Sequence, residues 1–304
     1  MKQNVIKGLV LTTGLGALLF FQACLPGNED TYDANKYFKI DSETLKNYIE
    51  TNSIDAEVDS ATGVYLVTHS PGEGYKTLNG VDIELHYRGF TLDGEQFVNS
   101  FAGFPVNIKL GDENTYPAPL TDAVLIAIFS MHEGDSTTIY SPSYYGFQDQ
   151  QYNNVPPNTP IAYTIKFVDI KKLDEDYVKI DQYITTKGFT AEIDPEFGTR
   201  TVVHVPGSTT GIDNNDYITL NYTGKLLDDQ QFDTSYGKNP LGFTIAKGEL
   251  IPGFELGVRE LNNLDSATIF VPSIYGYGAK ASGTIPANSV LVFGIKIVSV
   301  QKYL

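Results

Sequence analysis

Tyr277 is the residue whose setting most favours a chemical role. It lies between two glycines in the series Tyr275-Gly276-Tyr277-Gly278, and a flexible loop that presents an aromatic side chain suits a functional site. Asp233 follows Phe232 and, taken alone, would be interpreted as a turn residue. A phenol and a carboxylate can donate and accept hydrogen bonds, so the chemistry open to this pair depends on which residues surround it.

Other kinds of site have little support in the sequence. The four histidines, His69, His86, His132 and His204, have no ligand-like spacing, so we expect no metal site. No GxxxxGK[ST] phosphate loop occurs, and the single cysteine cannot form an internal disulfide. With 21 basic against 37 acidic residues, the net charge of -16 would repel a nucleic acid. We therefore expect a site that needs neither metal nor cofactor, and no nucleic-acid partner.

The chain contains an internal duplication with a period near 135 residues. Tyr87, Gly89, Phe97 and Pro105 recur at +135 as Tyr222, Gly224, Phe232 and Pro240. Pro142, Tyr145 and Gly146 recur at +130 as Pro272, Tyr275 and Gly276, so the first copy has an excess of five residues, placed near 112–119. Each copy is long enough to hold its own core. The duplication predicts two domains, residues 41–173 and 174–304.

The same elements are predicted in both copies. Residues 45–49 and 180–184 have apolar side chains at helical spacing, and Gly188 is a plausible end for the second helix. Four segments alternate between apolar and polar residues, which is typical of strands with one buried face: 81–87, 161–167, 218–222 and 291–297. Residues 253–261 predict one or two further helical turns. We therefore expect the α+β class, with a twisted antiparallel sheet around a short helix in each domain.

The motifs of the second copy follow one another in a familiar order. They are Asn221-Tyr222-Thr223-Gly224, Gln231-Phe232-Asp233, Gly248-Glu249-Leu250-Ile251-Pro252-Gly253-Phe254, Tyr275-Gly276-Tyr277-Gly278, Thr284-Ile285-Pro286 and Leu291-Val292-Phe293. From about Asp216 to Leu304 the chain resembles the FKBP-type peptidyl-prolyl isomerases. That resemblance implies a half-open antiparallel sheet around one short helix, with a shallow aromatic pocket that accepts a proline ring.

The resemblance also assigns roles to individual residues. Asp233 and Tyr277 are the implied catalytic pair: Tyr277 would donate a hydrogen bond to the substrate carbonyl, and Asp233 would form a polar wall. Phe254 stands at the pocket floor where the best-known members have Trp, and Leu241 replaces a frequent Phe on the rim. The implied substrate-binding residues are Tyr222, Phe232, Leu250, Ile251, Phe254, Ile285 and Phe293.

Prolyl isomerisation is compatible with such a residue set. It requires rotation about a bond with a barrier of about 18–20 kcal/mol, and it needs no nucleophile, metal or cofactor. The twisted transition state loses amide resonance. An apolar, water-poor pocket with one well-placed donor can therefore lower the barrier by differential binding.

The first copy lacks the polar parts of this site. Val98 stands in place of the carboxylate, Phe147 in place of the Tyr277 hydroxyl, and Val124 in place of the floor aromatic. Because its sheet and core positions persist, we interpret it as a degenerate FKBP-like domain that serves as a scaffold or recognition module.

The N-terminal segment has the layout of an export signal. Lys2 and Lys7 precede an uncharged stretch, 8–23, that is too short to span a bilayer. The sequence Phe21-Gln22-Ala23-Cys24 resembles the lipobox of bacterial lipoproteins, in which the cysteine is lipidated. We expect a signal peptide over 1–23, a lipid anchor at Cys24 and a tether over 24–40, in a protein held at the membrane of the bacterial cell envelope.

The sequence thus predicts a lipid-anchored isomerase that acts on proline-containing exported polypeptides through its second domain. Two alternatives stay open. One is a non-catalytic surface lipoprotein that binds peptides or proteins, and the other is a holdase chaperone with incidental isomerase activity.

Overall fold

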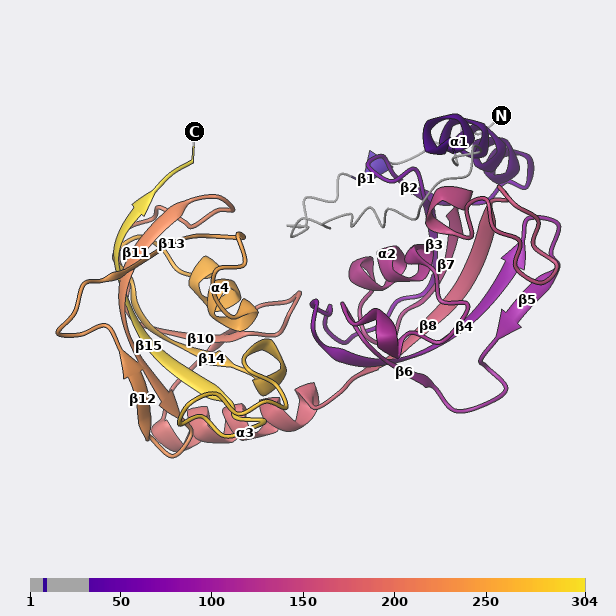
Figure 1. Ribbon diagram of the computed structural model, residues 1–304. Helices are drawn as coiled ribbons and strands as arrows, with labels where there is room; N and C mark the ends of the chain where they lie inside the picture. The colour runs from indigo at the N-terminus through magenta and orange to yellow at the C-terminus, as the bar shows by residue number, and fades with distance from the viewer. Residues whose placement is uncertain (1–7, 10–32, 304) are drawn as a thin grey trace, which may run out of the picture. The chain divides into compact units, whose positions relative to one another are not determined.

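The computed structural model describes residues 8–9 and 33–303. The chain divides into two compact units between Ile170 and Lys171 (Figure 1). Cys24 lies outside the described residues, as does most of the predicted signal peptide and tether. Among the described residues, no helix is both long and apolar enough to cross a membrane.

The described residues of the first unit form two α-helices and eight strands. In chain order its elements are β1 (Gly8–Leu9), α1 (Ala34–Thr51), β2 (Glu57–Asp59), β3 (Tyr65–Ser70), β4 (Asp82–Thr91), β5 (Gln96–Asn99), β6 (Val106–Lys109), the 3-10 helix η1 (Glu113–Thr115), α2 (Asp122–Ser130), β7 (Ser136–Ser141), the 3-10 helix η2 (Ser143–Tyr145) and β8 (Ile161–Ile170).

The second unit repeats this series. Its elements are α3 (Leu173–Lys187), β9 (Glu192–Ile193), β10 (Arg200–Val205), β11 (Tyr217–Leu226), β12 (Gln231–Thr234), β13 (Leu241–Thr244), α4 (Pro252–Arg259), β14 (Ser266–Val271), the 3-10 helix η3 (Ser273–Tyr275) and β15 (Leu291–Gln301). The loop at 112–119, where the sequence places the excess of the first copy, contains η1, which has no counterpart among these elements.

Both sheets have the same strand order. In the second unit it is β12-β11-β15-β14-β10-β9, with β13 paired to β11, and every pair is antiparallel. The first unit has the matching order β5-β4-β8-β7-β3-β2, with β6 on β4 and β1 added in parallel to β2. In each unit the sheet curves around its short helix, α2 or α4 (Figure 1). The predicted α+β architecture is therefore confirmed in both copies.

The predicted alternation along the strands is also confirmed. In β4, Ile83, Leu85 and Tyr87 are buried, while the intervening Glu84 and His86 are partly exposed. In β15, the predicted apolar positions from Leu291 to Ile297 are buried in the same way. One face of each sheet therefore packs on the short helix and forms the core.

The N-terminal helix differs from the prediction in its length. α1 begins at Ala34, inside the segment 24–40 that the sequence predicts as a tether. The side chain of Asp33 accepts a hydrogen bond from the backbone N–H of Lys36, at 3.0 Å, and so caps the first turn. In the second copy the predicted stop is found, because Gly188 ends α3 in the left-handed conformation, at a φ of 69°.

Candidate active site

A cluster of aromatic rings lines the inner face of the second sheet. Phe254, on α4, lies nearly perpendicular to Phe293, on β15, with ring centroids 4.9 Å apart. Tyr222 on β11 contacts both rings, with centroid distances of 6.1 and 6.2 Å. Phe232 on β12 lies 5.7 Å from Phe293. Edge-to-face pairs of this kind stabilise a fixed arrangement of rings, so four of the predicted substrate-binding residues form one wall.

The sequence missed a fifth ring under this wall. Phe243, on β13, is 1% exposed and packs on Phe254 at a centroid distance of 6.0 Å. It supports the aromatic residue that the family resemblance places at the pocket floor. The sequence offered one signal for Phe243, an apolar residue shortly after Pro240, but nothing in the sequence indicated that it contacts Phe254.

A hydrogen bond joins the cluster to the predicted catalytic carboxylate. The hydroxyl of Tyr222 donates to Asp233 Oδ2, and Asp233 Oδ1 accepts from the backbone N–H of Thr234 at 2.7 Å. Burial, then the bond to Asp233, raises the pKa of Tyr222 to about 12. The Tyr222 hydroxyl, then Thr234 and Lys238, holds the pKa of Asp233 below its ordinary value. At neutral pH the pair is therefore a neutral phenol that donates to a carboxylate.

Tyr277 reaches the same place from a loop. It follows η3 and its side chain is 41% exposed. Its hydroxyl is near enough to contribute to the raised pKa of Tyr222. Two backbone hydrogen bonds fix Gly278 beside it: its N–H donates to Ser273 and its carbonyl accepts from Asn288, both at 2.8 Å. Tyr277 therefore lies near Tyr222, and its side chain is exposed.

The three aliphatic candidates come from two loops. Leu250 and Ile251 directly precede α4, where Ile251 is the N-cap residue, and both are partly exposed. Ile285 is 5% exposed in the loop before β15, where it pairs with Ser282 through two 2.9 Å backbone hydrogen bonds. These aliphatic side chains take no part in the ring contacts above, and their part in the pocket stays a prediction.

Two carboxylates that sequence reasoning did not single out hold these loops. Glu255, on α4, accepts from the backbone N–H groups of Ala246, at 2.9 Å, and Leu250, at 3.4 Å. Burial raises the pKa of this carboxyl. Asp176, on α3, is 1% exposed and accepts from both the backbone N–H and the hydroxyl of Ser273. Since Ser273 begins η3, Asp176 ties the Tyr277 loop to the N-terminal helix of its unit.

The repeat itself could have revealed this second contact. Asp41 recurs as Asp176 at +135 and Ser143 recurs as Ser273 at +130. In the first unit Asp41 makes the same two hydrogen bonds to Ser143, with 2.8 Å to its backbone nitrogen.

The corresponding place in the first unit is filled by its own side chains. Phe147 stacks on Tyr152 with ring centroids 4.7 Å apart and an interplanar angle of 5°, and both rings lie against Phe97. Tyr87, the counterpart of Tyr222, is only 2% exposed. The hydroxyl of Tyr163, the counterpart of Phe293, donates to the carbonyl of buried Pro119 at 2.7 Å. With Val98 in place of Asp233, this cluster has no carboxylate, and its partly exposed phenol, Tyr152, is stacked on Phe147.

Among the described residues, no group of three or more His, Cys, Asp or Glu side chains is arranged to hold a metal ion. The polar groups of the site are one carboxylate and two phenols. They can bind, orient and donate to a peptide carbonyl.

Comparison with known proteins shows the family to which both units belong. The model of the FKBP-type peptidyl-prolyl cis-trans isomerase family matches twice, at residues 74–168 and 208–298, which together are more than half of the chain. The human peptidyl-prolyl cis-trans isomerase FKBP10 is 25% identical over 72% of this chain, and the chain spans about a third, 34%, of that relative. Peptidyl-prolyl cis-trans isomerase Fkbp12 of Drosophila melanogaster is 37% identical over 34% of this chain and 99% of its own length.

Solved structures with similar domains include the three FKBP domains of wheat FKBP73 and FkpA from Escherichia coli. The former matches at 19% identity and a TM-score of 0.35, over 79% of this chain and 95% of that chain. FkpA matches at 27% identity and a TM-score of 0.37, over 43% and 62%. With two matches to one family model, each on a unit that folds as a curved antiparallel sheet around a short helix, the chain belongs to the FKBP-type peptidyl-prolyl cis-trans isomerase family.

Proposed function

We propose that the second domain isomerises X-Pro bonds of exported polypeptides and that the first domain is non-catalytic. The observation that carries this proposal is the difference between the two ring clusters. In the second domain Tyr222 donates to Asp233 beside the 41% exposed Tyr277. In the first, Phe147 and Tyr152 stack over Phe97 where these polar groups would lie.

The geometry assigns a separate task to each polar group. The proline ring would lie on the wall formed by Phe254 and Phe293, out of water. Because the Tyr222 hydroxyl is already donated to Asp233, it is Tyr277 that has a free donor for the substrate carbonyl as the amide twists out of resonance. Asp233 keeps the edge of the pocket polar and holds the Tyr222 ring in place.

A coupled prolyl-peptide assay on the intact chain tests this proposal. The double variant D233L/Y277F should lose at least about tenfold in kcat/KM, the effect of about 1.4 kcal/mol of lost transition-state stabilisation. The matched change in the first domain, V98L/F147L, should leave kcat/KM unchanged. Absence of activity in the intact chain, or full activity in D233L/Y277F, would overturn the catalytic role. Suppression of client aggregation that survives in D233L/Y277F, with no rate effect, would instead support a binding protein or holdase.

The place of action follows from the N-terminal sequence. We expect cleavage before Cys24 and lipidation of that cysteine, which would attach the two domains to a membrane of the bacterial cell envelope. Mass spectrometry of the N-terminal peptide tests the lipid, and Cys24→Ser should release the protein from the membrane fraction. Retention of the variant in that fraction would contradict the anchor.

A further inference from the structure

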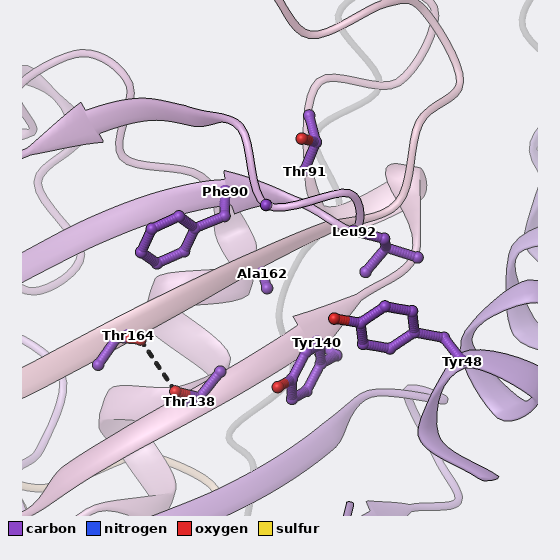
Figure 2. A pocket seen from close by; sticks show the side chains of 9 residues that line it. Tyr48, Phe90, Thr91, Leu92, Thr138, Tyr140, Ala162 and Thr164 are labelled. Carbon is purple, nitrogen blue, oxygen red and sulfur yellow. Dashed lines mark hydrogen bonds between the residues drawn. The ribbon is translucent and has the colours of Figure 1, made fainter. Parts of the chain in front are cut away.

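The first domain has a cavity on the sheet face that is turned away from its ring cluster. Its volume is about 160 Å³, and it lies between α1, the turn after β4, and strands β7 and β8 (Figure 2). Thr164 lines it, whereas the preceding Tyr163 belongs to the ring cluster, and successive strand residues point to opposite faces. The cavity is therefore separate from the degenerate isomerase site.

The lining combines aromatic rings with hydroxyl groups. Tyr48, from α1, and Tyr140, from β7, present rings whose centroids are 5.7 Å apart. Thr138, on the same strand as Tyr140, and Thr164, on the neighbouring β8, have hydroxyls that are hydrogen-bonded to each other at 2.9 Å (Figure 2). The Thr138 hydroxyl also makes a hydrogen bond of 2.7 Å with His69 Nε2. None of the nine described residues that line the cavity carries a charged side chain. Both tyrosine hydroxyls remain available, since within the described part of the chain neither makes a hydrogen bond.

The second domain has an ion pair at the equivalent place. Tyr183 and Phe270 form the same ring pair, at 5.8 Å. There Asp229 in the turn after β11 accepts from the Tyr183 hydroxyl at 2.8 Å and pairs with Lys187 at 2.7 Å. This contact ties the turn to the helix.

The first domain lacks the residues of that ion pair and has more hydroxyl groups at this place. Gly94 stands where the second copy has Asp229, and Asn52 where it has Lys187. A Cβ at Gly94 would meet no atom within 4 Å, so the backbone at this position faces open space. In addition, Tyr140 and Thr164 replace Phe270 and Gly294, which adds two hydroxyls to the same surface.

We propose that this cavity binds one neutral sugar ring, either as a free monosaccharide or as the terminal residue of a glycan. A volume of about 160 Å³ matches about five waters of ~30 Å³ each, which suits one small ring rather than a drug-sized molecule. Hydroxyls donate and accept, so they can pair with sugar hydroxyls, while the tyrosine rings cover the apolar face of the ring. The uncharged lining and the net charge of -16 disfavour an acidic sugar.

Titration of the intact chain with glucose, galactose, mannose and N-acetylglucosamine, followed by NMR and calorimetry, tests this proposal. We expect at least one of them to bind in the millimolar range and to shift the resonances of Tyr48 and Tyr140. Glucuronic acid should not bind. An oligosaccharide that ends in the same sugar distinguishes the two sources: tighter binding identifies a glycan terminus, and equal binding identifies the free sugar.

The double variant G94D/N52K restores the residues of the second copy and should weaken binding at least about tenfold. Gly94 has a φ of 91°, and aspartate is among the residues that adopt positive φ most readily, as Asp229 does at 67°. Tyr140→Phe should weaken binding while the same change at exposed Tyr303 should not, and prolyl isomerase activity should be unchanged in all three. Failure of every neutral sugar to bind, or binding that G94D/N52K leaves intact, would overturn the proposal.

Discussion

At the residue scale, the hydrogen bond from the Tyr222 hydroxyl to Asp233 determines how the site responds to pH. Tyr222→Phe removes the first cause of the lowered pKa of Asp233, so that pKa should rise toward its ordinary value. We expect kcat/KM to fall by up to about tenfold, because the hydrogen bond to a charged group that orients Asp233 is lost. Carboxyl-detected NMR titration and the peptide assay measure the two effects.

The wild-type profile follows from the same pair. With the pKa of Asp233 lowered and that of Tyr222 raised to about 12, neither group titrates between about pH 5 and pH 9. Activity should be constant over that range. The control for Tyr222→Phe is Tyr87→Phe, the same change in the first domain, which should leave kcat/KM unchanged. A wild-type activity that changes severalfold between these pH values would contradict the assignment.

Gly224 allows the Phe232 and Phe293 rings to pack closely against strand β11. A Cβ at this position would lie 2.5 Å from the Phe232 ring and 3.0 Å from the Phe293 ring. Gly224→Ala should therefore displace the wall and destabilise the domain by about 1–3 kcal/mol, the usual range for overpacking. Gly294→Ala on the neighbouring strand meets nothing within 4 Å and is the matched control. Denaturant unfolding and the peptide assay compare the two variants, and equal effects would show that ring displacement is not the cause.

At the element scale, Asp176 connects helix α3 to the loop that carries Tyr277. Asp176→Ala leaves the buried N–H of Ser273 without its acceptor, which should cost about 1–3 kcal/mol of stability. It should also lower kcat, because the η3 segment and Tyr277 lose their attachment. Asp41→Ala removes the same contact from the first domain. It should destabilise that unit while kcat and KM stay unchanged, and a loss of kcat in both variants would contradict a specific role for Asp176.

The sequence predicted the elements of this site better than their connections. The order of the motifs, through the family resemblance, assigned Tyr222, Phe232, Phe254 and Phe293 to the pocket, and the structure brings the four rings together. Asp176 and Glu255 were missed because each is a carboxylate in a helix, where it would usually be solvated. Only the folded chain shows that they accept backbone N–H groups from distant loops. The early start of α1 was missed for a different reason. The segment before it is polar and has no clear apolar period, so the Asp33 cap was not recognised.

At the scale of the whole molecule, the two copies differ in their response to acid. Asp216, at the start of β11, is buried and accepts from the Lys302 side chain at 2.6 Å, from Asp213 N–H at 2.7 Å and from Tyr303 N–H at 2.9 Å. Burial alone would raise its pKa, but these partners outweigh burial and lower it. The equivalent residue of the first copy is Val81. A carboxylate at this position therefore holds the C-terminal residues Lys302 and Tyr303 in the second unit, and the first unit has no equivalent of it.

This asymmetry predicts how stability depends on pH. Because the folded-state pKa of Asp216 is depressed, its contribution is present above the unfolded value near 3.9 and is lost as pH falls through the folded value. Asp216→Asn should therefore destabilise the second unit by about 1–3 kcal/mol at pH 7 and by progressively less below about pH 4. Calorimetry of the intact chain should show only one unfolding transition shifted. Asp213 is an exposed partner of the same lysine, so Asp213→Asn should lower the free energy of unfolding by less than about 1 kcal/mol. If the destabilisation by Asp216→Asn persisted undiminished in acid, the ionised carboxylate would be ruled out as the source of the stability.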